Sequence, residues 1–417
     1  MRLAVLTILL WFASPANTEA QPQKYLFTYL GIKDGLLADN IFAVQQDEKG
    51  FIWLASNNAL QRYDGQRFLN FYQEPGNPGS LPPGGIRGMK LDKRNRLWLL
   101  SGTISVGYFD LRTFRYTPVS VKDAPGNDPQ AANALYIDED DNVVLIIVGH
   151  GYVTYDENTK TFSSKKNPFA IPAGWGPLYF WQDRMRNYWV GSHQGLLKYN
   201  PVKKLLSYRD HNTEGDAIIE HFGYARTVVF AFLDKSGRFW VTSWPENKLH
   251  IRSFSPADNK EREWFPAITK ALKGQYFEMM GISEFSDGSL WMAGINIFGK
   301  FNDSVTAVEP VFSNASEEYS IRYDNIYYLH EDREKNIWVC TNKGLFWFNP
   351  SSQVFRSIAN RSVGNTTSYP NDVTGFLETK DGQILVSTWG AGAFSYDQQF
   401  RPVNSAYVDR TSQPGEG

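Results

Sequence analysis

Histidines are the side chains in this sequence that could do acid–base or metal chemistry near neutral pH, so their spacing indicates whether such chemistry is present. The six histidines are scattered over 417 residues, at positions 150, 193, 211, 221, 250 and 330. None belongs to a His-Glu-x-x-His motif, and the chain has no Cys-x-x-Cys pair, no Gly-x-Ser-x-Gly and no glycine-rich phosphate loop. Zinc-protease, zinc-ribbon and hydrolase-elbow chemistry therefore have no support, and we predict no catalytic residues, no metal site and no cofactor.

The single cysteine, Cys340, also has a structural interpretation. It stands in the apolar strand pattern Ile337-Trp338-Val339-Cys340, where a thiol behaves as a small hydrophobic group. With one cysteine the chain forms no internal disulfide and must rely on its core. We predict that Cys340 fills the core and is not a nucleophile.

The composition excludes partners that need a strong overall charge. Forty-two Lys and Arg residues against 44 Asp and Glu residues give a net charge of −2, so no whole-chain field attracts nucleic acid or an anionic membrane. Aromatic residues make up 15% of the sequence, and such side chains favour half-buried, pleated surfaces. The composition therefore favours β structure.

One pattern repeats along most of the chain. Its first copy reads Ile41-Phe42-Ala43-Val44, Asp47, Gly50-Phe51-Ile52-Trp53-Leu54 and Tyr63-Asp64-Gly65. The tryptophan position recurs about every 44 to 51 residues, at Trp53, Trp98, Leu145, Trp189, Trp240, Trp291, Trp338 and Leu385. Asp six residues earlier and Gly or Asn three residues earlier are typical of turns, because Asp caps its own backbone and Gly or Asn accepts a positive φ. We therefore interpret the repeated Asp as structural.

Each copy predicts four short strands with tight connections, and helical periodicity is absent at any length outside the N-terminal segment. A single four-stranded unit cannot bury both of its faces, so the copies must pack against one another. Radial packing around an axis achieves this and leaves only short exposed edges. The predicted fold is an all-β propeller of four-stranded blades, with the recurring tryptophan filling the space between neighbouring sheets.

Eight copies leave two ways to close the ring. The favoured interpretation places seven repeats in residues 21–360 and treats residues 361–417 as an eighth repeat that starts a second propeller. Tyr25–Leu30 resembles a fourth strand that lacks its other three, so we assign it as the strand that closes the first ring. The alternative is one eight-bladed ring.

Residues 1–20 have the organisation of a secretory signal peptide. Arg2 precedes an apolar stretch from Leu3 to Ala13, and small residues allow cleavage after Ala16 or Ala20. The apolar stretch is too short to span a bilayer, and no later segment could do so. We predict an exported protein.

Several copies resemble the two-component regulator propeller family, which forms the periplasmic sensor region of bacterial hybrid two-component systems. The resemblance covers roughly residues 25–400 and rests on the opening, Ile32 to Ile41, Gln46 to Leu54 and Arg62 to Gly65, and on the W-x-G-T-x-x-G-L signature at Trp189–Leu196 and Trp338–Leu345. Leu145 and Leu385, and Trp244-Pro245-Glu246-Asn247 in place of the Gly-Leu pair, depart from that pattern.

The resemblance implies a periplasmic sensor that detects oligo- or polysaccharides and controls genes for their use. In that family, transmembrane, histidine kinase and response-regulator parts follow the propellers, and none is present in this chain. The protein would be membrane-anchored only as part of a longer chain, and a second copy in a homodimer is a further partner to consider. The sequence does not identify the glycan.

Ligand recognition is expected on the face where the connections between second and third strands meet those between successive blades, because a rigid scaffold leaves these loops free to vary. Sugars need aromatic surfaces for stacking and amide or charged groups for hydrogen bonds. The predicted ligand-binding residues are His150, Trp175, His193, Gln194, Arg226, Trp244, Asn296, Asn342, Lys343 and Trp389, with Asn57 and Asn58 on the same face.

Three functions remain open at this point. The favoured one is a sensor-type binding module for an oligo- or polysaccharide, without enzymatic activity. A secreted propeller enzyme of the streptogramin-lyase type would need a metal-assisted cluster of His and carboxylate residues near the axis. A protein-interaction platform without a small ligand is the third.

Overall fold

A computed structural model describes residues 25–57, 59–102, 105–122, 133–315, 319–353, 372–389, 392–398, 400 and 403. The predicted signal peptide, residues 1–20, lies outside this described part. The chain divides into two compact units, Met1–Val354 and Phe355–Gly417. No helix in the described residues is long and apolar enough to cross a membrane.

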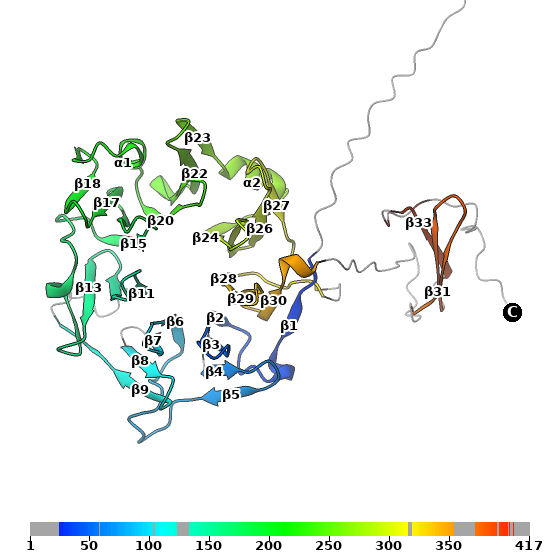
Figure 1. The fold of residues 1–417 in the computed structure, drawn as a ribbon, viewed down its shortest axis with the longest axis horizontal. Helices are drawn as coiled ribbons and strands as arrows, with labels where there is room; N and C mark the ends of the chain where they lie inside the picture. The colour runs from blue at the N-terminus through cyan, green and yellow to red at the C-terminus, as the bar shows by residue number, and fades with distance from the viewer. Residues whose placement is uncertain are drawn as a thin grey trace, which may run out of the picture. The chain divides into compact units, whose positions relative to one another are not determined.

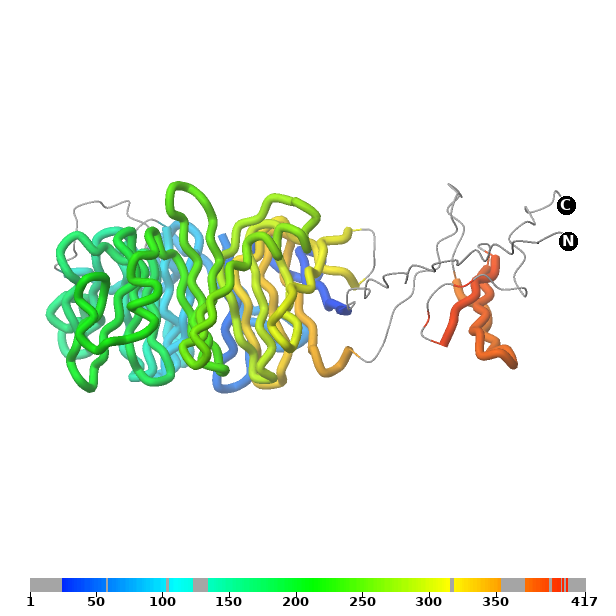
Figure 2. The backbone as a smooth tube through the Cα atoms, turned by 90° about the horizontal axis from the view of Figure 1, so that it is seen from above, coloured from blue at the N-terminus to red at the C-terminus, as the bar shows by residue number. Residues whose placement is uncertain are grey.

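The first unit is a β-propeller, as predicted, with seven sheets whose inner strands surround one axis (Figure 1). Viewed from the side, the strands run through the thickness of the ring (Figure 2). Neighbouring strands are antiparallel apart from β10, which pairs parallel with β14. The short helices in the connections are η1 (Ile32–Asp34), η2 (Ser164–Lys166), α1 (Ala217–Phe222), η3 (Pro245–Asn247), α2 (Phe265–Ala271) and η4 (Pro350–Ser352).

Apart from β10 and β1, the strands follow chain order from the innermost to the outermost in each sheet. Sheets one to four contain β2 (Ile41–Gln46), β3 (Ile52–Ser56), β4 (Leu60–Tyr63) and β5 (Phe68–Phe71); β6 (Ile86–Leu91), β7 (Arg96–Ser101), β8 (Ser105–Asp110) and β9 (Arg115–Pro118); β11 (Asn133–Ile137), β12 (Val143–Ile147), β13 (Gly151–Asp156) and β14 (Thr161–Ser163), with β10 (Ser120–Val121); and β15 (Pro177–Gln182), β16 (Tyr188–Ser192), β17 (Leu196–Asn200), β18 (Leu205–Tyr208) and β19 (His211–Asn212). Sheets five to seven contain β20 (Val228–Leu233), β21 (Phe239–Ser243), β22 (His250–Ser255) and β23 (Lys260–Glu263); β24 (Glu278–Glu284), β25 (Leu290–Ile295), β26 (Ile297–Phe301) and β27 (Val308–Pro310); and β28 (Ile326–Glu331), β29 (Ile337–Thr341) and β30 (Gly344–Phe348), with β1 (Thr28–Leu30) as the outer strand.

The outer strand of the seventh sheet comes from the beginning of the chain. Strand β1 pairs antiparallel with β30 in the register Thr28 to Trp347 and Leu30 to Leu345. Immediately before it, Tyr25 and Phe27 are buried in the core between the sixth and seventh sheets. Backbone hydrogen bonds and aromatic packing therefore join the two ends of the ring.

The recurring tryptophans fill the space between sheets, which confirms their predicted role as core residues. Trp189 and Trp240 are 1% and 0% exposed. Each ring contacts an aromatic side chain of the next sheet, with centroid distances of 4.6 Å from Trp189 to Phe239 and 4.8 Å from Trp240 to Phe301. Cys340, also 0% exposed, is a core residue as expected, and burial raises the pKa of its thiol.

The repeated Asp does more than shape its turn. In five sheets its Oδ2 accepts a hydrogen bond from the indole Nε1 six residues later, as in Trp53 to Asp47 and Trp240 to Asp234, with N–O distances of 2.8 to 2.9 Å. Its Oδ1 accepts backbone N–H groups of the turn itself, as Asp47 does from Lys49 and Phe51. We call the edge of the ring that carries these turns the turn face, and the opposite edge the loop face.

One position of the repeat was wrongly assigned from the sequence. In the third sheet the Asp138 N–H donates to Asn142 O, the same turn bond that joins Asp47 to Phe51, so Val144 and not Leu145 is equivalent to the tryptophan. Asp141, with φ of 67°, takes the positive-φ place that Asn142 was expected to take. The acidic and amide residues of 138–142 allow both alignments in sequence, and only the hydrogen bonds distinguish them.

The second unit contains one antiparallel sheet of β31 (Val373–Glu378), β32 (Ile384–Thr388) and β33 (Gly392–Tyr396). Phe376, which is equivalent to buried Val44 of the first sheet, is 72% exposed. That this repeat starts a second propeller stays a prediction.

Candidate ligand-binding site

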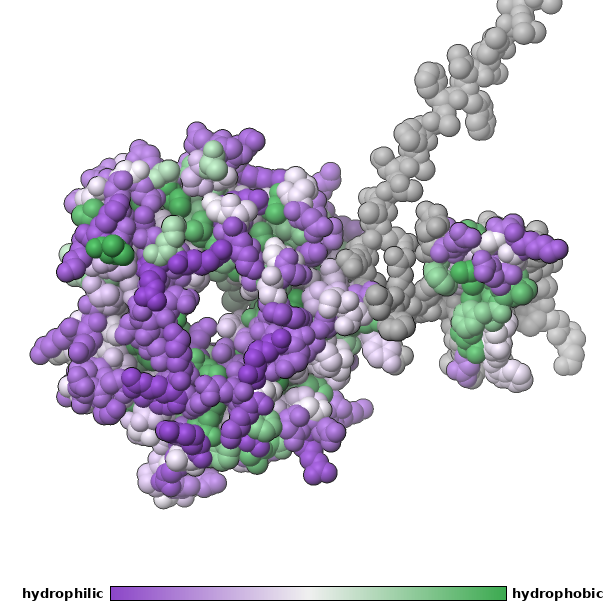
Figure 3. Space-filling view, viewed as in Figure 1, coloured by the Kyte–Doolittle hydropathy of each residue, from purple (hydrophilic) through white to green (hydrophobic). Residues whose placement is uncertain are grey.

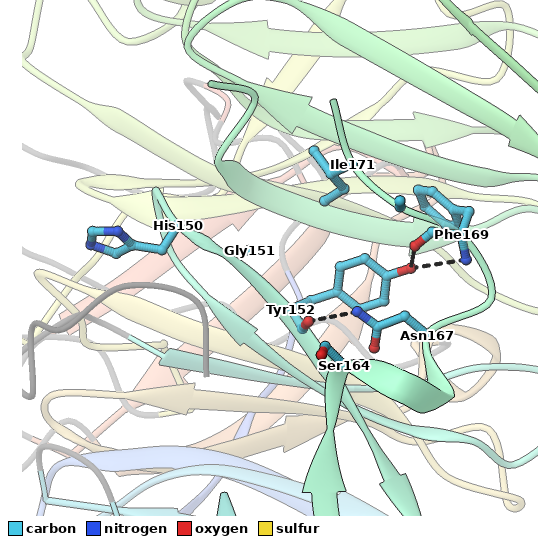
Figure 4. Close-up of a pocket in the computed structure, with 8 residues that line it drawn as sticks. His150, Gly151, Tyr152, Ser164, Asn167, Phe169 and Ile171 are labelled. Atoms are coloured by element: carbon cyan, nitrogen blue, oxygen red, sulfur yellow. Dashed lines mark hydrogen bonds between the residues drawn. The ribbon is translucent and has the colours of Figure 1, made fainter. Parts of the chain in front are cut away.

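The loop face carries a pocket of about 520 Å³ on the third sheet (Figure 4). It lies between the start of β13 and the connection from β14 through η2 toward β15. The residues that line it are His150, Gly151, Tyr152, Ser164, Asn167, Phe169, Ala170 and Ile171. Of the predicted site residues, His150 is therefore placed in a cavity of the size that holds a small ligand.

Hydrogen bonds fix the polar side of this pocket. The Tyr152 hydroxyl donates to the Phe169 carbonyl at 2.5 Å, and the Phe169 N–H donates to the same hydroxyl oxygen at 3.3 Å. The Asn167 amide Nδ2 donates to the Tyr152 carbonyl at 2.8 Å, while its Oδ1 accepts from Thr154 Oγ1 at 3.1 Å. Asn167 thus has an oriented amide whose remaining donor and acceptor capacity can serve a ligand.

Burial keeps the Tyr152 side chain of this pocket uncharged. It raises the pKa of Tyr152 above its ordinary value, so this hydroxyl stays protonated at neutral pH. Phe169 is buried and packs against Phe180 and Tyr199, whereas Ala170 is exposed. Exposed His150 lies at one end of the group, away from the Tyr152 hydroxyl (Figure 4). The pocket therefore offers an apolar wall with an amide, a hydroxyl and an imidazole at its edges.

The other predicted residues are not gathered in this pocket. Trp175 is half-buried, and its ring packs edge-on against Tyr208 at a centroid distance of 5.0 Å. His193 and Trp244 meet one residue of the next connection: His193 Nδ1 lies 3.4 Å from Thr227 Oγ1, and the Trp244 N–H donates to the Thr227 carbonyl. Arg226 is exposed beside this residue.

Gln194 is held inside the same region. Its backbone N–H donates to Ser192 Oγ, and its side-chain Oε1 is buried without a hydrogen-bond partner among the described residues. That Gln194 contacts a ligand stays a prediction.

A third group joins sheets six and seven. The Asn342 side chain accepts from the backbone N–H groups of Asp324 and Asn325 and donates to the Asp324 carboxylate. Lys343 Nζ lies 2.9 Å from Asp324 Oδ2, and this hydrogen bond holds the Asp324 pKa below its ordinary value. Asn296, with φ of 53°, donates its N–H to the Asp324 carbonyl. Asp324 thus forms hydrogen bonds with Asn296, Asn342 and Lys343.

The remaining predicted residues lie elsewhere. Trp389 belongs to the second unit and is 71% exposed. Asn57 is exposed, and Asn58 lies outside the described residues. Within the described part of the chain, no cluster of three or more His, Cys, Asp and Glu side chains could hold a metal ion.

Sequence reasoning missed Asn167 and Phe169, the residues that shape the pocket. Both stand in the long connection after β14, which the sequence identified as functional without naming these two. Their roles depend on contacts with Tyr152, fifteen and seventeen residues away, and a loop sequence does not reveal such contacts.

No family model matches this chain, and no curated protein matches it. Among solved structures, the extracellular domain of a protein described as a hybrid two-component system from B. thetaiotaomicron is 16% identical, with a TM-score of 0.60, and covers 93% of this chain and 55% of that structure. A second such domain from the same organism is 15% identical, with a TM-score of 0.55, and covers 90% of this chain and 46% of that one. A streptogramin B lyase is 11% identical, with a TM-score of 0.52, and covers 78% of this chain and 98% of the lyase.

These likenesses show the fold, because all three identities are low. The chain spans about half of the length of the two extracellular domains that it matches. The protein is a β-propeller whose similar solved structures include the extracellular domains of two-component systems.

Proposed function

We propose that this protein is a ligand-binding sensor propeller that recognises an oligo- or polysaccharide on its loop face. The observation that carries the proposal is the pocket beside His150, where a fixed Asn167 amide and a Tyr152 hydroxyl adjoin the aromatic Phe169. Saccharides bind through this combination of apolar stacking and oriented hydrogen bonds. The likeness to extracellular domains of two-component systems supports the role of a sensor.

The same proposal includes a location and partners. The signal-like sequence of residues 1–20 supports export to the periplasm. Signal transduction requires the transmembrane, histidine kinase and response-regulator parts that the family resemblance implies for a longer chain. The proposed partner of this chain is a glycan. The proposal includes neither nucleic-acid binding nor enzymatic turnover.

The likeness to streptogramin B lyase favours one alternative, a secreted propeller enzyme. Turnover of a macrocyclic lactone or a glycan by the purified chain, abolished by His150→Ala or His193→Ala, would support it. Binding without turnover would support the sensor.

The test is calorimetric titration of the full chain with a panel of neutral and charged oligosaccharides. We expect Ala170→Trp, which fills the pocket, to abolish binding, and His150→Ala to weaken it about 5- to 30-fold, an effect typical of a contact worth 1 to 2 kcal/mol. His211→Ala, at an exposed position on β19, is the matched control. Unchanged binding by Ala170→Trp would remove the pocket from the proposal.

A further inference from the structure

The centre of the propeller is hollow (Figure 3), and the innermost strands around it differ in the residues that they carry. The innermost strand of each sheet contributes one residue directly opposite the tryptophan position. On three consecutive sheets this layer is aromatic, with Tyr136, Trp181 and Phe232. On the four remaining sheets it is polar, with Gln45, Lys90, Ser283 and His330.

The polar side chains meet around one tyrosine. Lys90 Nζ lies 3.3 Å from the Tyr328 hydroxyl and 5.0 Å from the centre of its ring. Gln45 Nε2 donates to the same hydroxyl at 3.4 Å. Lys90 belongs to the second sheet and Tyr328 to the seventh, with the first sheet between them, so these side chains extend along the inner edge of the ring toward each other. Because two donors approach the hydroxyl oxygen, the hydroxyl proton is available to a further acceptor.

The charge of Lys90 is not neutralised by a carboxylate. Among the described residues, no Asp or Glu oxygen lies within salt-bridge distance of its Nζ, although the side chain is half-buried. Arg87, an exposed residue three positions earlier on β6, adds a second positive charge nearer the start of the strand. The inner edge of the second sheet is therefore cationic.

His330 supplies an imidazole in the same place. Its Nε2 is buried and has no hydrogen-bond partner among the described residues. Burial is the main cause that lowers the His330 pKa, to about 4, and the charge of Lys90 contributes to the lowering. A neutral imidazole beside an ammonium group is thus left with an unfilled hydrogen-bonding position.

Tyr179 stands on β15, the innermost strand of the fourth sheet. Burial raises the pKa of Tyr179. Tyr179 also packs against Phe230, with a centroid distance of 5.2 Å.

We propose that the central channel binds an oxyanion group of a ligand, a carboxylate or a sulfate, through Lys90, Tyr328 and His330. The ammonium group of Lys90 balances the charge, and the Tyr328 hydroxyl and the imidazole donate hydrogen bonds to the oxygens. The aromatic wall of Tyr136, Trp181 and Phe232 provides a surface for the apolar face of the attached sugar. The inference rests on the proposed function in one respect, the saccharide nature of the ligand, and it narrows that ligand to acidic saccharides.

The experiment titrates the full chain with glucuronate, glucose 6-sulfate, glucose and inorganic sulfate, by calorimetry and by NMR of the histidine side chains. We expect the two acidic sugars to bind at least 10-fold more tightly than glucose, and the His330 resonance to shift with sulfate alone. Lys90→Met keeps the apolar stem and should weaken binding of both acidic sugars at least 10-fold. Lys49→Met, at an exposed lysine in the first turn, is the matched control and should change nothing.

Tyr328→Phe removes only the hydroxyl and serves where Lys90→Met fails to fold; a 3- to 10-fold weakening is expected. Equal affinities for glucuronate and glucose would overturn the proposal, as would equal behaviour of Lys90→Met and Lys49→Met. Absence of binding by every anion at millimolar concentration would also overturn it. Binding of neutral oligosaccharides that Ala170→Trp abolishes would leave the proposed function intact in that case, so the two failures are distinguishable.

Discussion

The turn face and the loop face of the ring differ in how far their contacts repeat from sheet to sheet. On the turn face, five sheets use the same hydrogen bond from a tryptophan indole to an aspartate, with little variation in length. On the loop face, the third sheet has a pocket, the fourth and fifth sheets meet at Thr227, and the sixth and seventh meet at Asp324. The turn face thus repeats one contact, whereas the loop face, which carries the candidate site, has different contacts in different sheets.

Two sheets, the third and the sixth, lack the tryptophan–aspartate hydrogen bond of the turn face. In the sixth sheet, where Phe285 replaces the aspartate, the Trp291 indole donates to Ser289 Oγ at 3.0 Å. In the third sheet, where Val144 replaces the tryptophan, the Asp138 carboxylate accepts instead from the Tyr188 hydroxyl of the fourth sheet at 2.7 Å. The partners change, but the Trp291 indole and the Asp138 carboxylate each still have one, and an unpaired buried group at these positions would be costly.

The largest expected effect comes from removing a turn-face tryptophan. Trp189→Ala leaves a cavity against Phe239 and removes one of the hydrogen bonds that the Asp183 carboxylate accepts, and should lower the free energy of unfolding by about 3 to 5 kcal/mol. Trp244→Ala on the loop face should cost clearly less, since Trp244 is only partly buried. Denaturant unfolding followed by fluorescence and by circular dichroism measures both. Equal losses for the two variants would end the distinction between the faces.

The second-largest expected effect is the pH dependence of stability that His330 of the central channel causes. The His330 pKa of about 4 in the folded protein lies below the ordinary value of 6.5, so the unfolded chain binds more protons between these values. The contribution of His330 is therefore complete above about pH 6.5 and is lost as the pH falls toward 4, by up to about 3 kcal/mol. The charged groups that act on it are Lys90, Glu331 and Asp332.

Stability measured from pH 8 to pH 4 on wild type and His330→Gln checks this expectation. The variant should lack this part of the pH dependence, so the stability difference between the two proteins should shift in its favour as the pH falls. Asn57→Ala, which replaces an exposed residue without a titratable group, is the control and should leave the profile unchanged. A wild-type profile identical to that of His330→Gln would place His330 in contact with solvent.

Much of this architecture could be predicted from the sequence because the turn face repeats. Asp47 and Trp53 recur with fixed spacing, and fixed spacing in sequence reports a fixed distance in space. The hydrogen bond between them was not predicted, since a turn preference alone explained the aspartate. The error at Leu145 has a related origin: with the tryptophan absent, the run of polar residues before Val144 gave two equally good alignments.

The candidate site was less predictable because loop residues act through contacts that leave no periodic signal. His150 was placed on the correct connection by its position after the second strand. Asn167 and Phe169 owe their importance to Tyr152, a strand residue that the sequence presents as ordinary core. Lys90 and His330 are far apart in sequence, and only closure of the ring brings both to the inner edge.

A smaller effect is expected from neutralising one turn-face carboxylate. Asp234 accepts hydrogen bonds from the Trp240 indole, the Ser236 hydroxyl and two backbone N–H groups. Asp234→Asn keeps the shape but loses the charge and turns one acceptor into a donor, which should cost about 1 to 2 kcal/mol. Ser289→Ala in the sixth sheet removes the neutral bond from the Trp291 indole and the bond that Ser289 Oγ donates to the exposed Asp287 carboxylate. It should cost about half as much in the same unfolding experiment. The opposite order would show that the charge is unimportant at this position.

The smallest effect is expected from the loop-face ion pair of Lys343 and Asp324. Both side chains are more than half exposed, at 51% and 59%, so solvent screens their attraction and Lys343→Ala should cost less than about 1 kcal/mol. The loss should disappear in 1 M salt, where the screening length is only about 3 Å. Asn342→Ala is the informative neighbour, because its carbonyl accepts two backbone N–H groups that would lose their partner in the variant, and its cost should persist in high salt. Thermal unfolding of both variants at 50 mM and 1 M salt separates these terms. A salt-insensitive loss of several kcal/mol for Lys343→Ala would mean that the loop face supports the fold as strongly as the turn face does.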